Sequence, residues 1–197
     1  MSDPLFDAAD DAAKPLQAEE REQLIPTYII SRAELNEIEH IGVSDADRWV
    51  FSRKRGDVLD TNFLLTLHRR MFREVWRWAG ELRTTGRNIG VDPIQIGVQL
   101  RQLTDDVQYW IDNATFSPDE IVARFHHKLV WIHPFQNGNG RHARLAADLL
   151  AVRLGRPRFT WGSANLVVPA QTRRLYVEAL RAADKHDIAP LLTFVRS

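Results

Sequence analysis

The sequence predicts an all-α fold, a single mostly helical domain with one small β-hairpin flap. Apolar residues recur at helical spacing through most of the chain, as at Ile121, Phe125 and Leu129. Helix-start signals precede such runs; the clearest is Ser117–Glu120, where a serine cap is followed by a proline and a capping-box acid. Only residues 82–96 differ in character, since threonine, isoleucine and valine alternate there with glycine and proline.

The first half of the chain is expected to hold three helices. Residues 1–25 are polar, acidic and rich in alanine, so we expect a tail or a loosely docked arm. A capping box predicts a helix over residues 31–40, and Ser44 is expected to cap a second one. Asp60 should cap a third helix that continues to Trp78.

The second half is expected to be helical on both sides of one loop. Residues 82–96 are predicted to form the hairpin or an extended flap, and helical spacing returns from Gly97. The helix that begins at Ser117 leads to His133, and a second long helix ends near Gly155. After an irregular connection, the remaining helices are expected over residues 170–185 and 188–195.

The totals limit the classes of function. Lysine plus arginine and aspartate plus glutamate both number 26, and this zero net charge argues against direct nucleic-acid binding or binding to an anionic membrane. The chain has no cysteine, which excludes disulfides and thiolate chemistry. The acidic start lacks a signal-peptide pattern, and no apolar run is long enough to span a bilayer. We therefore expect a cytoplasmic protein.

The stretch HPFQNGNGRHAR, which begins at His133, has the composition of an anion-binding loop. A proline and a Gly-Asn-Gly run interrupt the helix, and Gly138 and Gly140 let a ligand approach the backbone. The next helix offers free N–H groups and a partial positive charge at its start. Arg141 and Arg144 share one face of its first turns. His133 would stand beside the anion as a base.

Each of these residues also has a purely structural reading. A histidine at a helix end usually caps the helix, two arginines can form a solvated face, and glycines can simply form turns. Phe135 is expected to fill the core and fix the loop. His126, His127 and His142 are not expected to form a metal site, because no carboxylate stands at a ligand spacing from them. The combination in one loop favours the functional reading.

The stretch resembles the signature HPFx(D/E)GNGRxxR of the Fic/Doc family. The sequence around it is similar to that of the subgroup named mobile mystery protein B. The resemblance covers roughly residues 55–155. It implies a Fic-type helical bundle with a hairpin flap. The domains would then be an N-terminal arm and helical extension over 1–54 and a Fic-like catalytic domain with C-terminal helices over 55–197.

The resemblance implies a protein adenylyltransferase, which moves AMP from ATP to a hydroxyl side chain of a target protein that can be the enzyme itself. His133 would take the proton from the hydroxyl. Arg141 would hold the pyrophosphate and Arg144 the γ-phosphate, while the 82–96 flap would hold the target segment by main-chain pairing. Three residues would line the anion hole: Gly138, Asn139 and Gly140.

Two further expectations follow from the resemblance. Asn137 stands where the family has an acidic residue for Mg²⁺, so the metal would meet a neutral amide oxygen and activity is in question. Many members also carry an inhibitory helix whose glutamate pairs with the second motif arginine. Glu34, in the 31–40 helix, is the first candidate for that role and Glu37 the second.

Two alternatives remain open at this point. The chain could use the same scaffold to transfer another phosphate-linked group. It could also be a catalytically weak nucleotide-binding protein that acts in a toxin–antitoxin pair or as a dimer. The intact His133 favours an enzyme, whereas Asn137 favours the weak binder.

Overall fold

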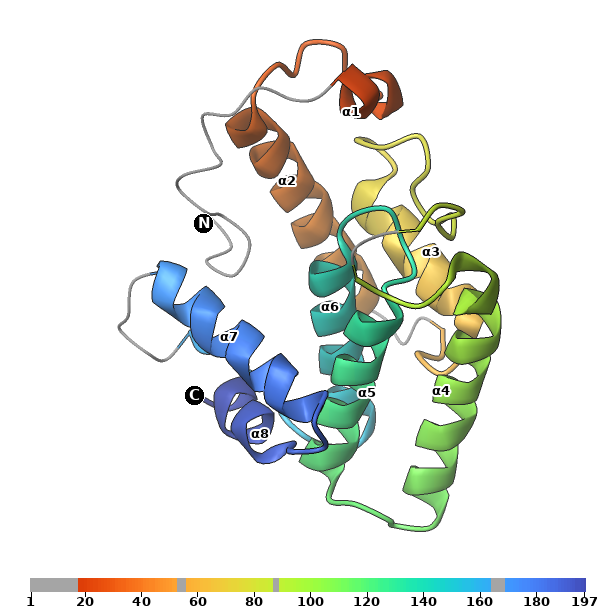
Figure 1. The fold of residues 1–197 in the computed structure, drawn as a ribbon, viewed down its shortest axis with the longest axis vertical. Coiled ribbons are helices and arrows are strands. Elements are labelled where there is room, and N and C mark those ends of the chain that lie inside the picture. The colour runs from red at the N-terminus through yellow and green to blue at the C-terminus, as the bar shows by residue number, and fades with distance from the viewer. Residues whose placement is uncertain (1–17, 53–55, 87–88, 164–168) are drawn as a thin grey trace.

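The computed structural model describes residues 18–52, 56–86, 89–163 and 169–197, and helices dominate these ranges, as predicted (Figure 1). None of the helices within them is long and apolar enough to cross a membrane. A 3-10 turn, η1 (Pro93–Gln95), precedes α4. The α-helices are α1 (Ala18–Gln23), α2 (Arg32–Phe51), α3 (Thr61–Phe72), α4 (Ile96–Asp112), α5 (Pro118–Ile132), α6 (Asn139–Arg153), α7 (Pro169–Ala183) and α8 (Ala189–Val195).

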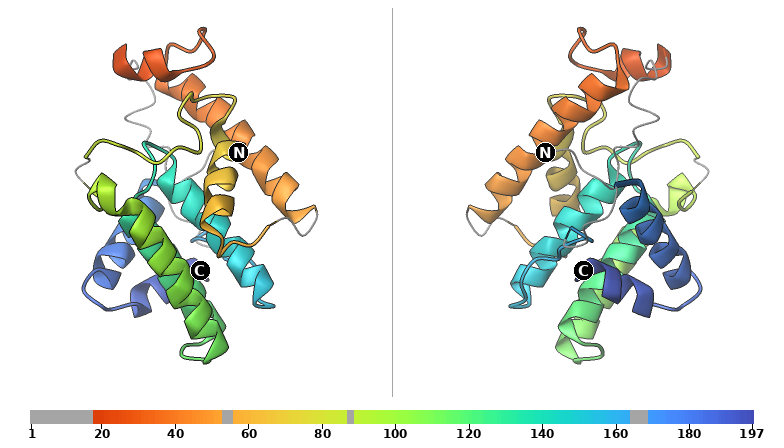
Figure 2. Two further views of the ribbon diagram at one scale, coloured as in Figure 1. Left: turned by 90° about the vertical axis from the view of Figure 1, so that its right-hand side faces the viewer. Right: turned by 90° about the vertical axis from the view of Figure 1, so that its left-hand side faces the viewer.

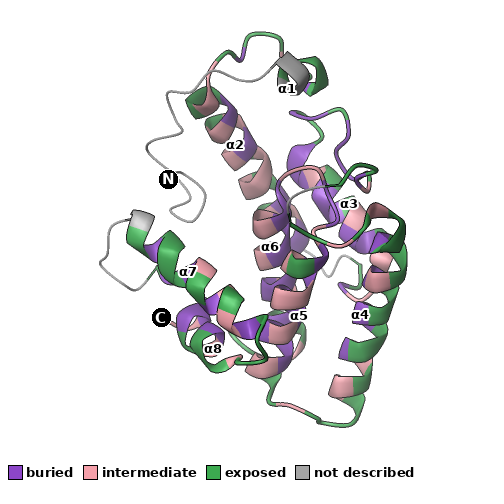
Figure 3. Cartoon of the chain, viewed as in Figure 1, coloured by how far each residue is buried: buried purple, intermediate pink, exposed green. Residues whose placement is uncertain are grey.

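Helices α5 and α6 form the centre of the fold and run antiparallel, side by side (Figures 1 and 2). The α2–α3 pair packs against α6, α4 lies along α5, and the α7–α8 pair closes the other side through α8 (Figure 1). Figure 3 shows buried residues concentrated on the central pair. Four alanines of α6 are fully buried, and such small side chains allow neighbouring helices to approach closely: Ala143, Ala146, Ala147 and Ala151.

The segment just before α2 is docked and not loose. The amide of Ile25 donates to the carbonyl of Val75 at 2.9 Å, and that of Arg77 donates to Gln23 at 3.0 Å. Leu24 is buried. The prediction of a loosely docked arm was therefore wrong for residues 23–25, while residues 1–17 lie outside the described ranges.

Helix α2 replaces the two helices that were predicted between residues 31 and 51. The capping box at its start is confirmed, but Ser44 lies inside the helix and does not cap a new one. Gly42, inside this helix, has a packing role: a Cβ there would collide with the carbonyl oxygen of Met71 in α3. Gly42 thus lets two helices touch while remaining helical.

Helix α3 begins at its predicted cap, since the Asp60 side chain accepts from the amide of Asn62. It ends at Phe72 and not at Trp78, because the chain folds into successive turns after Phe72. Those turns bury Trp76 and Trp78, whose rings stack at 5.0 Å between centroids. Trp76 and Trp78, which were expected to lie at the end of a longer helix, are instead buried in these turns, beside the loop after α5.

The predicted hairpin is absent from the described residues 82–86 and 89–96, which contain no strand; residues 87 and 88 lie outside the described ranges. The described parts of this segment, residues 82–86 and 89–92, are called the flap below; they are extended and attached to the end of α5 and the loop after it. The amide of Arg83 donates to the carbonyl of Pro134 at 2.9 Å, and the amide of Val91 donates to Ile132 at 3.3 Å.

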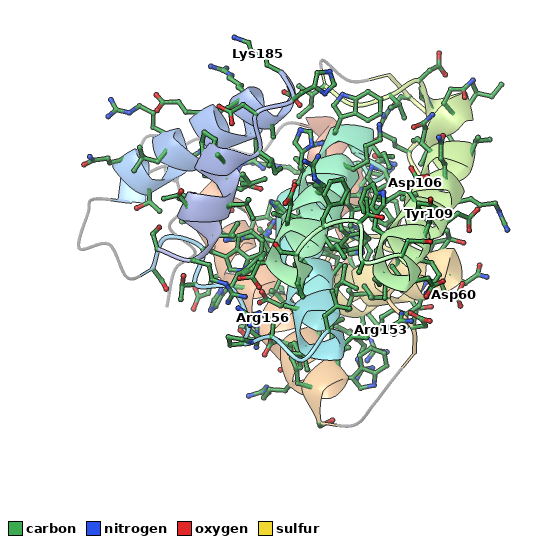
Figure 4. The ribbon with its side chains drawn as sticks, turned by 90° about the horizontal axis from the view of Figure 1, so that it is seen from below. Asp60, Asp106, Tyr109, Arg153, Arg156 and Lys185 are labelled. Atoms are coloured by element: carbon green, nitrogen blue, oxygen red, sulfur yellow. The ribbon has the colours of Figure 1, made fainter. Side chains whose placement is uncertain are left out.

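The later helices agree with prediction, with Ser117 capping α5. Arg153 is the last residue of α6 and forms an ion pair with Asp57, and Arg156, three residues later, forms one with Asp119 (both arginines are labelled in Figure 4). Asp119 also binds Arg196 at 2.6 Å, which ties the C-terminal residues to the start of α5. The predicted domain boundary at residues 54 and 55 falls among residues 53–55, outside the described ranges, so the two-domain division stays a prediction.

Candidate active site

The loop between α5 and α6 has a sharply defined backbone. It begins at His133, the residue after α5, whose φ of 53° and ψ of 61° lie in the left-handed region. It ends at Gly138, which precedes α6 and is also left-handed, with φ 76°. Glycine adopts this conformation freely, whereas a histidine there costs about 1–2 kcal/mol. The surrounding contacts must therefore hold His133 in place.

Asn139 fixes the loop from within. Its side-chain oxygen accepts from the amide of Phe135 and its side-chain nitrogen donates to the carbonyl of the same residue, both at 2.8 Å. Phe135 is fully buried, which confirms its predicted place in the core. Asn139 was predicted to line an anion hole; its side chain is used here to shape the loop, which leaves only its main chain for a ligand.

His68 of α3 supports the loop from below. Its Nδ1 accepts from the amide of Gly80 at 3.0 Å, so the proton lies on Nε2, which donates to the carbonyl of Asn137 at 3.1 Å. Its ring stacks on Phe135 with 3.7 Å between centroids. Burial and the neighbouring His142 hold the pKa of His68 well below its ordinary value. A neutral imidazole is thus built into the base of the loop.

The other candidate histidines also serve packing. His126 lies 2.9 Å from the hydroxyl of Tyr176, and His127 lies 2.8 Å from a carboxylate oxygen of Asp184. His142 donates to the carbonyl of Leu64 at 2.9 Å. Burial lowers the pKa of His126 to about 3 and that of His142 to about 4. His126 joins α5 to α7, and His142 joins α6 to α3, as neutral rings.

Arg141 carries the strongest charge contact of the site. Its guanidinium donates to a carboxylate oxygen of Glu39 in α2 at 2.6 Å, and the indole nitrogen of Trp76 donates to the other oxygen at 2.6 Å. The carboxylate of Glu39 is 2% exposed and the guanidinium of Arg141 is 11% exposed. The arginine predicted to hold a pyrophosphate therefore faces a buried carboxylate.

Glu34 does not occupy the place predicted for it. Its carboxylate accepts from the amides of Ile30 and Ser31 at 2.9 and 3.0 Å and from the Ser31 hydroxyl at 3.0 Å. These hydrogen bonds hold the pKa of Glu34 below its ordinary value. Glu34 is exposed and belongs to the capping box. The expected pairing of Glu34 with Arg144 is corrected to a pairing of Glu39 with Arg141.

Asn137, which was predicted to contact a metal ion, lies at the turn before α6. Its side-chain oxygen accepts from the amide of Gly138 at 2.7 Å. The atom that would bind a cation is thus engaged with the loop itself, and a metal ion would have to displace that contact. A neutral amide oxygen already binds a hard cation more weakly than a carboxylate does.

The sequence profile of the Fic/DOC family matches residues 58–151, which run from α3 to α6 and include this loop. Through these residues the chain belongs to the Fic/DOC family. Protein adenylyltransferase fic-1 of Caenorhabditis elegans is 34% identical over 146 residues, which cover 72% of this chain and 27% of the relative. The chain spans about a quarter to a third of the length of the curated relatives that it matches.

Solved Fic domains have the same fold. A fragment of Fic-1 from Caenorhabditis elegans is 29% identical and aligns with a TM-score of 0.66 over 90% of this chain and 52% of that one. The BepC protein of Bartonella tribocorum, with bound AMPPNP, is 18% identical and aligns with a TM-score of 0.68 over 91% and 97% of the two chains. The second likeness supports the fold alone.

The structure adds three residues to the Fic site that the sequence analysis missed: Glu39, Arg83 and His68. Glu39 could have been found from the sequence, because helical spacing places it on the same buried face of α2 as Leu35, Ala46 and Val50. A glutamate on an apolar helix face needs a buried partner. The contacts that bring Arg83 and His68 to the loop are with His133 and Asn137, 50 and 69 positions away, and no local pattern reveals them.

Proposed function

We propose that this chain is a protein adenylyltransferase that transfers AMP from ATP to a hydroxyl side chain of a target protein. The observation that carries the proposal is one juxtaposition: His133 stands at the end of α5, and the glycine-flanked start of α6 follows five residues later with Arg141 on its first turn. Such a helix start is suited to phosphate. The curated relative named above, fic-1 of Caenorhabditis elegans, is a protein adenylyltransferase.

The proposed step transfers AMP to the target hydroxyl and releases pyrophosphate. The target hydroxyl oxygen bonds to the α-phosphorus of ATP while the bond from that phosphorus to the bridging oxygen breaks and pyrophosphate leaves. His133 accepts the hydroxyl proton. Gly138, Asn139 and Gly140 would bind phosphate through their main chain, and the negative charge would fall on Arg141 and Arg144.

Mg²⁺ is the proposed cofactor, and it would neutralise phosphate charge when bound with ATP. Asn137 is the residue of the loop that would contact it, through the oxygen that now accepts from Gly138. The fit is weaker than with a carboxylate, so the phosphates themselves would hold most of the metal. We propose no fixed geometry for this ion.

The Glu39–Arg141 pair would inhibit the proposed reaction. A phosphate bound at Arg141 needs the same guanidinium, and two anions cannot share one partly buried arginine without repulsion. The protein would therefore rest in a state of low nucleotide affinity. We propose that Glu39, and not Glu34 or Glu37, is the inhibitory glutamate.

Labelled ATP tests the proposed function. The wild-type protein and Glu39→Gln are incubated with candidate target lysate and ATP labelled at either the α or the γ phosphate. AMP transfer places the α label on protein and never the γ label. Protein that carries the γ label would point to phosphotransfer. No label in either protein would favour the alternative of a weak nucleotide-binding partner, which Asn137 makes the second candidate.

A further inference from the structure

The side chain of Arg83 is buried to 2% exposure and donates to main-chain carbonyls on two different parts of the chain. Its Nε donates to the carbonyl of His133 at 2.6 Å. Its terminal nitrogens donate to Thr85 at 3.0 Å, to Val91, and at 3.5 Å to Ile132. Hydrogen bonds from a charged donor are stronger than neutral ones, and burial strengthens them further.

One set of acceptors is the end of α5. The carbonyls of the last helical turn have no partner within the helix and carry partial negative charge, so a guanidinium there caps the helix. The carbonyl of His133 belongs to the residue whose left-handed backbone opens the loop. Arg83 thus bonds directly to the strained residue that would act as base.

The other set of acceptors comes from both parts of the flap, since Thr85 lies in residues 82–86 and Val91 in residues 89–92. The flap also lies directly against the base. A Cβ added at Gly90 would stand 2.6 Å from Cβ of His133 and 2.8 Å from a terminal nitrogen of Arg83. Hydrogen bonds from one guanidinium therefore fix the position of the flap relative to the base residue. A β-sheet hydrogen-bond ladder, which the predicted hairpin would have supplied, is not needed for this.

We propose that Arg83 is a positioning residue for the transfer reaction. It sets the distance between the flap, which would present the target segment, and His133, which would accept the proton. The inference rests on the proposed function. Nucleotide binding should not depend on Arg83, because the start of α6 is shaped by Asn139 and His68, not by the flap.

The test variant is Arg83→Lys, which keeps the charge but cannot reach several carbonyls at once. The matched control is Arg77→Lys, at an exposed arginine just before the flap. A misplacement of about 1 Å can cost roughly 10²-fold in rate, so we expect Arg83→Lys to lower kcat for transfer by about 10- to 100-fold. The Kd for ATP should stay within about twofold of wild type, a change worth less than roughly 0.5 kcal/mol.

Two readouts do not depend on activity. Amide exchange should accelerate at Arg83 and Val91, whose N–H groups bind the end of α5, and the imidazole resonances of His133 should shift. Unchanged exchange and unchanged resonances in Arg83→Lys would overturn the positioning role, even if transfer were lost. A wild-type protein without transfer would refute the proposed function, while these two readouts would still decide whether Arg83 fixes His133.

If Arg83→Lys does not fold, Gly90→Ala tests the same coupling between the flap and His133. The added methyl group would crowd Cβ of His133 and a terminal nitrogen of Arg83, so it separates the flap from both while the arginine side chain is kept. Lower kcat with unchanged ATP affinity would support the coupling of flap and base. Full transfer activity in Gly90→Ala would contradict it.

Discussion

Replacing Glu39 by glutamine should make the protein less stable and its nucleotide affinity higher. Glutamine keeps the size of the side chain and can still accept from the indole of Trp76, which lies 2.6 Å from the carboxylate. It removes the negative charge that faces Arg141 at 2.6 Å. A guanidinium released from a carboxylate is then available to a phosphate, which is why the two effects have opposite signs.

The sizes of both effects follow from the burial of the pair. A charge-assisted hydrogen bond contributes about 1.5–3 kcal/mol, so nucleotide affinity should rise by roughly 10- to 150-fold. Breaking a buried pair from one side destabilises by up to about 3–5 kcal/mol, and Arg141, at 11% exposure, is close to that limit. Saturating ATP should restore part of the lost stability, because it binds only the folded state.

The assay is a titration with ATP, by calorimetry for affinity and by thermal unfolding for stability. The matched control is Glu34→Gln, on the same helix, where the exposed carboxylate serves the capping box. We expect the control to leave the ATP affinity unchanged. If Glu39→Gln lowers stability but leaves affinity equal to that of Glu34→Gln, the Glu39–Arg141 pair is purely structural and the inhibitory role is refuted.

Three other changes test the site. In the folded protein the pKa of His126 is about 3 and that of His142 about 4, and the pKa of His68 is also lowered. Below about pH 6.5, where histidines of the unfolded chain become protonated, the unfolded chain therefore binds more protons than the folded protein does. Stability should fall as pH falls, by roughly 5 kcal/mol at about pH 4.5 for the first two alone, which acid titration of the unfolding midpoint would show. Asn137→Asp should raise Mg²⁺ affinity in the presence of ATP, and equal titration curves would mean that residue 137 does not contact the metal. Gly138→Ala should destabilise by about 1–3 kcal/mol in denaturant unfolding, because it strains a left-handed residue and places a methyl group against a phenylalanine ring.

Local sequence signals predicted most helices of this chain, because most helices have a recognisable cap or apolar periodicity within their own residues. The caps at Ser31, Asp60 and Ser117 are all formed, and the helices after them follow apolar periodicity. The same signals failed where tertiary contacts decide. Ser44 was expected to cap a new helix because serine is a capping residue type, but it lies inside α2, where Gly42 contacts α3.

The site was predicted unevenly for the same reason. A contiguous motif marks His133 and Arg141, and the structure places them at the end of α5 and on the first turn of α6. The residues that hold them come from elsewhere: Glu39 is 102 positions from Arg141, and Arg83 is 50 positions from His133. The 82–96 segment had strand-like composition, but buried hydrogen bonds from Arg83 fix it where a strand ladder was expected.

The most direct test of the proposed reaction is transfer of α-labelled AMP by His133→Ala and His133→Asn, measured in the Glu39→Gln background. Asparagine tolerates the left-handed backbone of residue 133 better than alanine does, so the pair separates loss of the base from loss of the loop conformation. We predict that both variants bind ATP with unchanged Kd and transfer AMP about 10²- to 10⁴-fold more slowly. Transfer at the parental rate in either variant would contradict the assignment of His133 as the base.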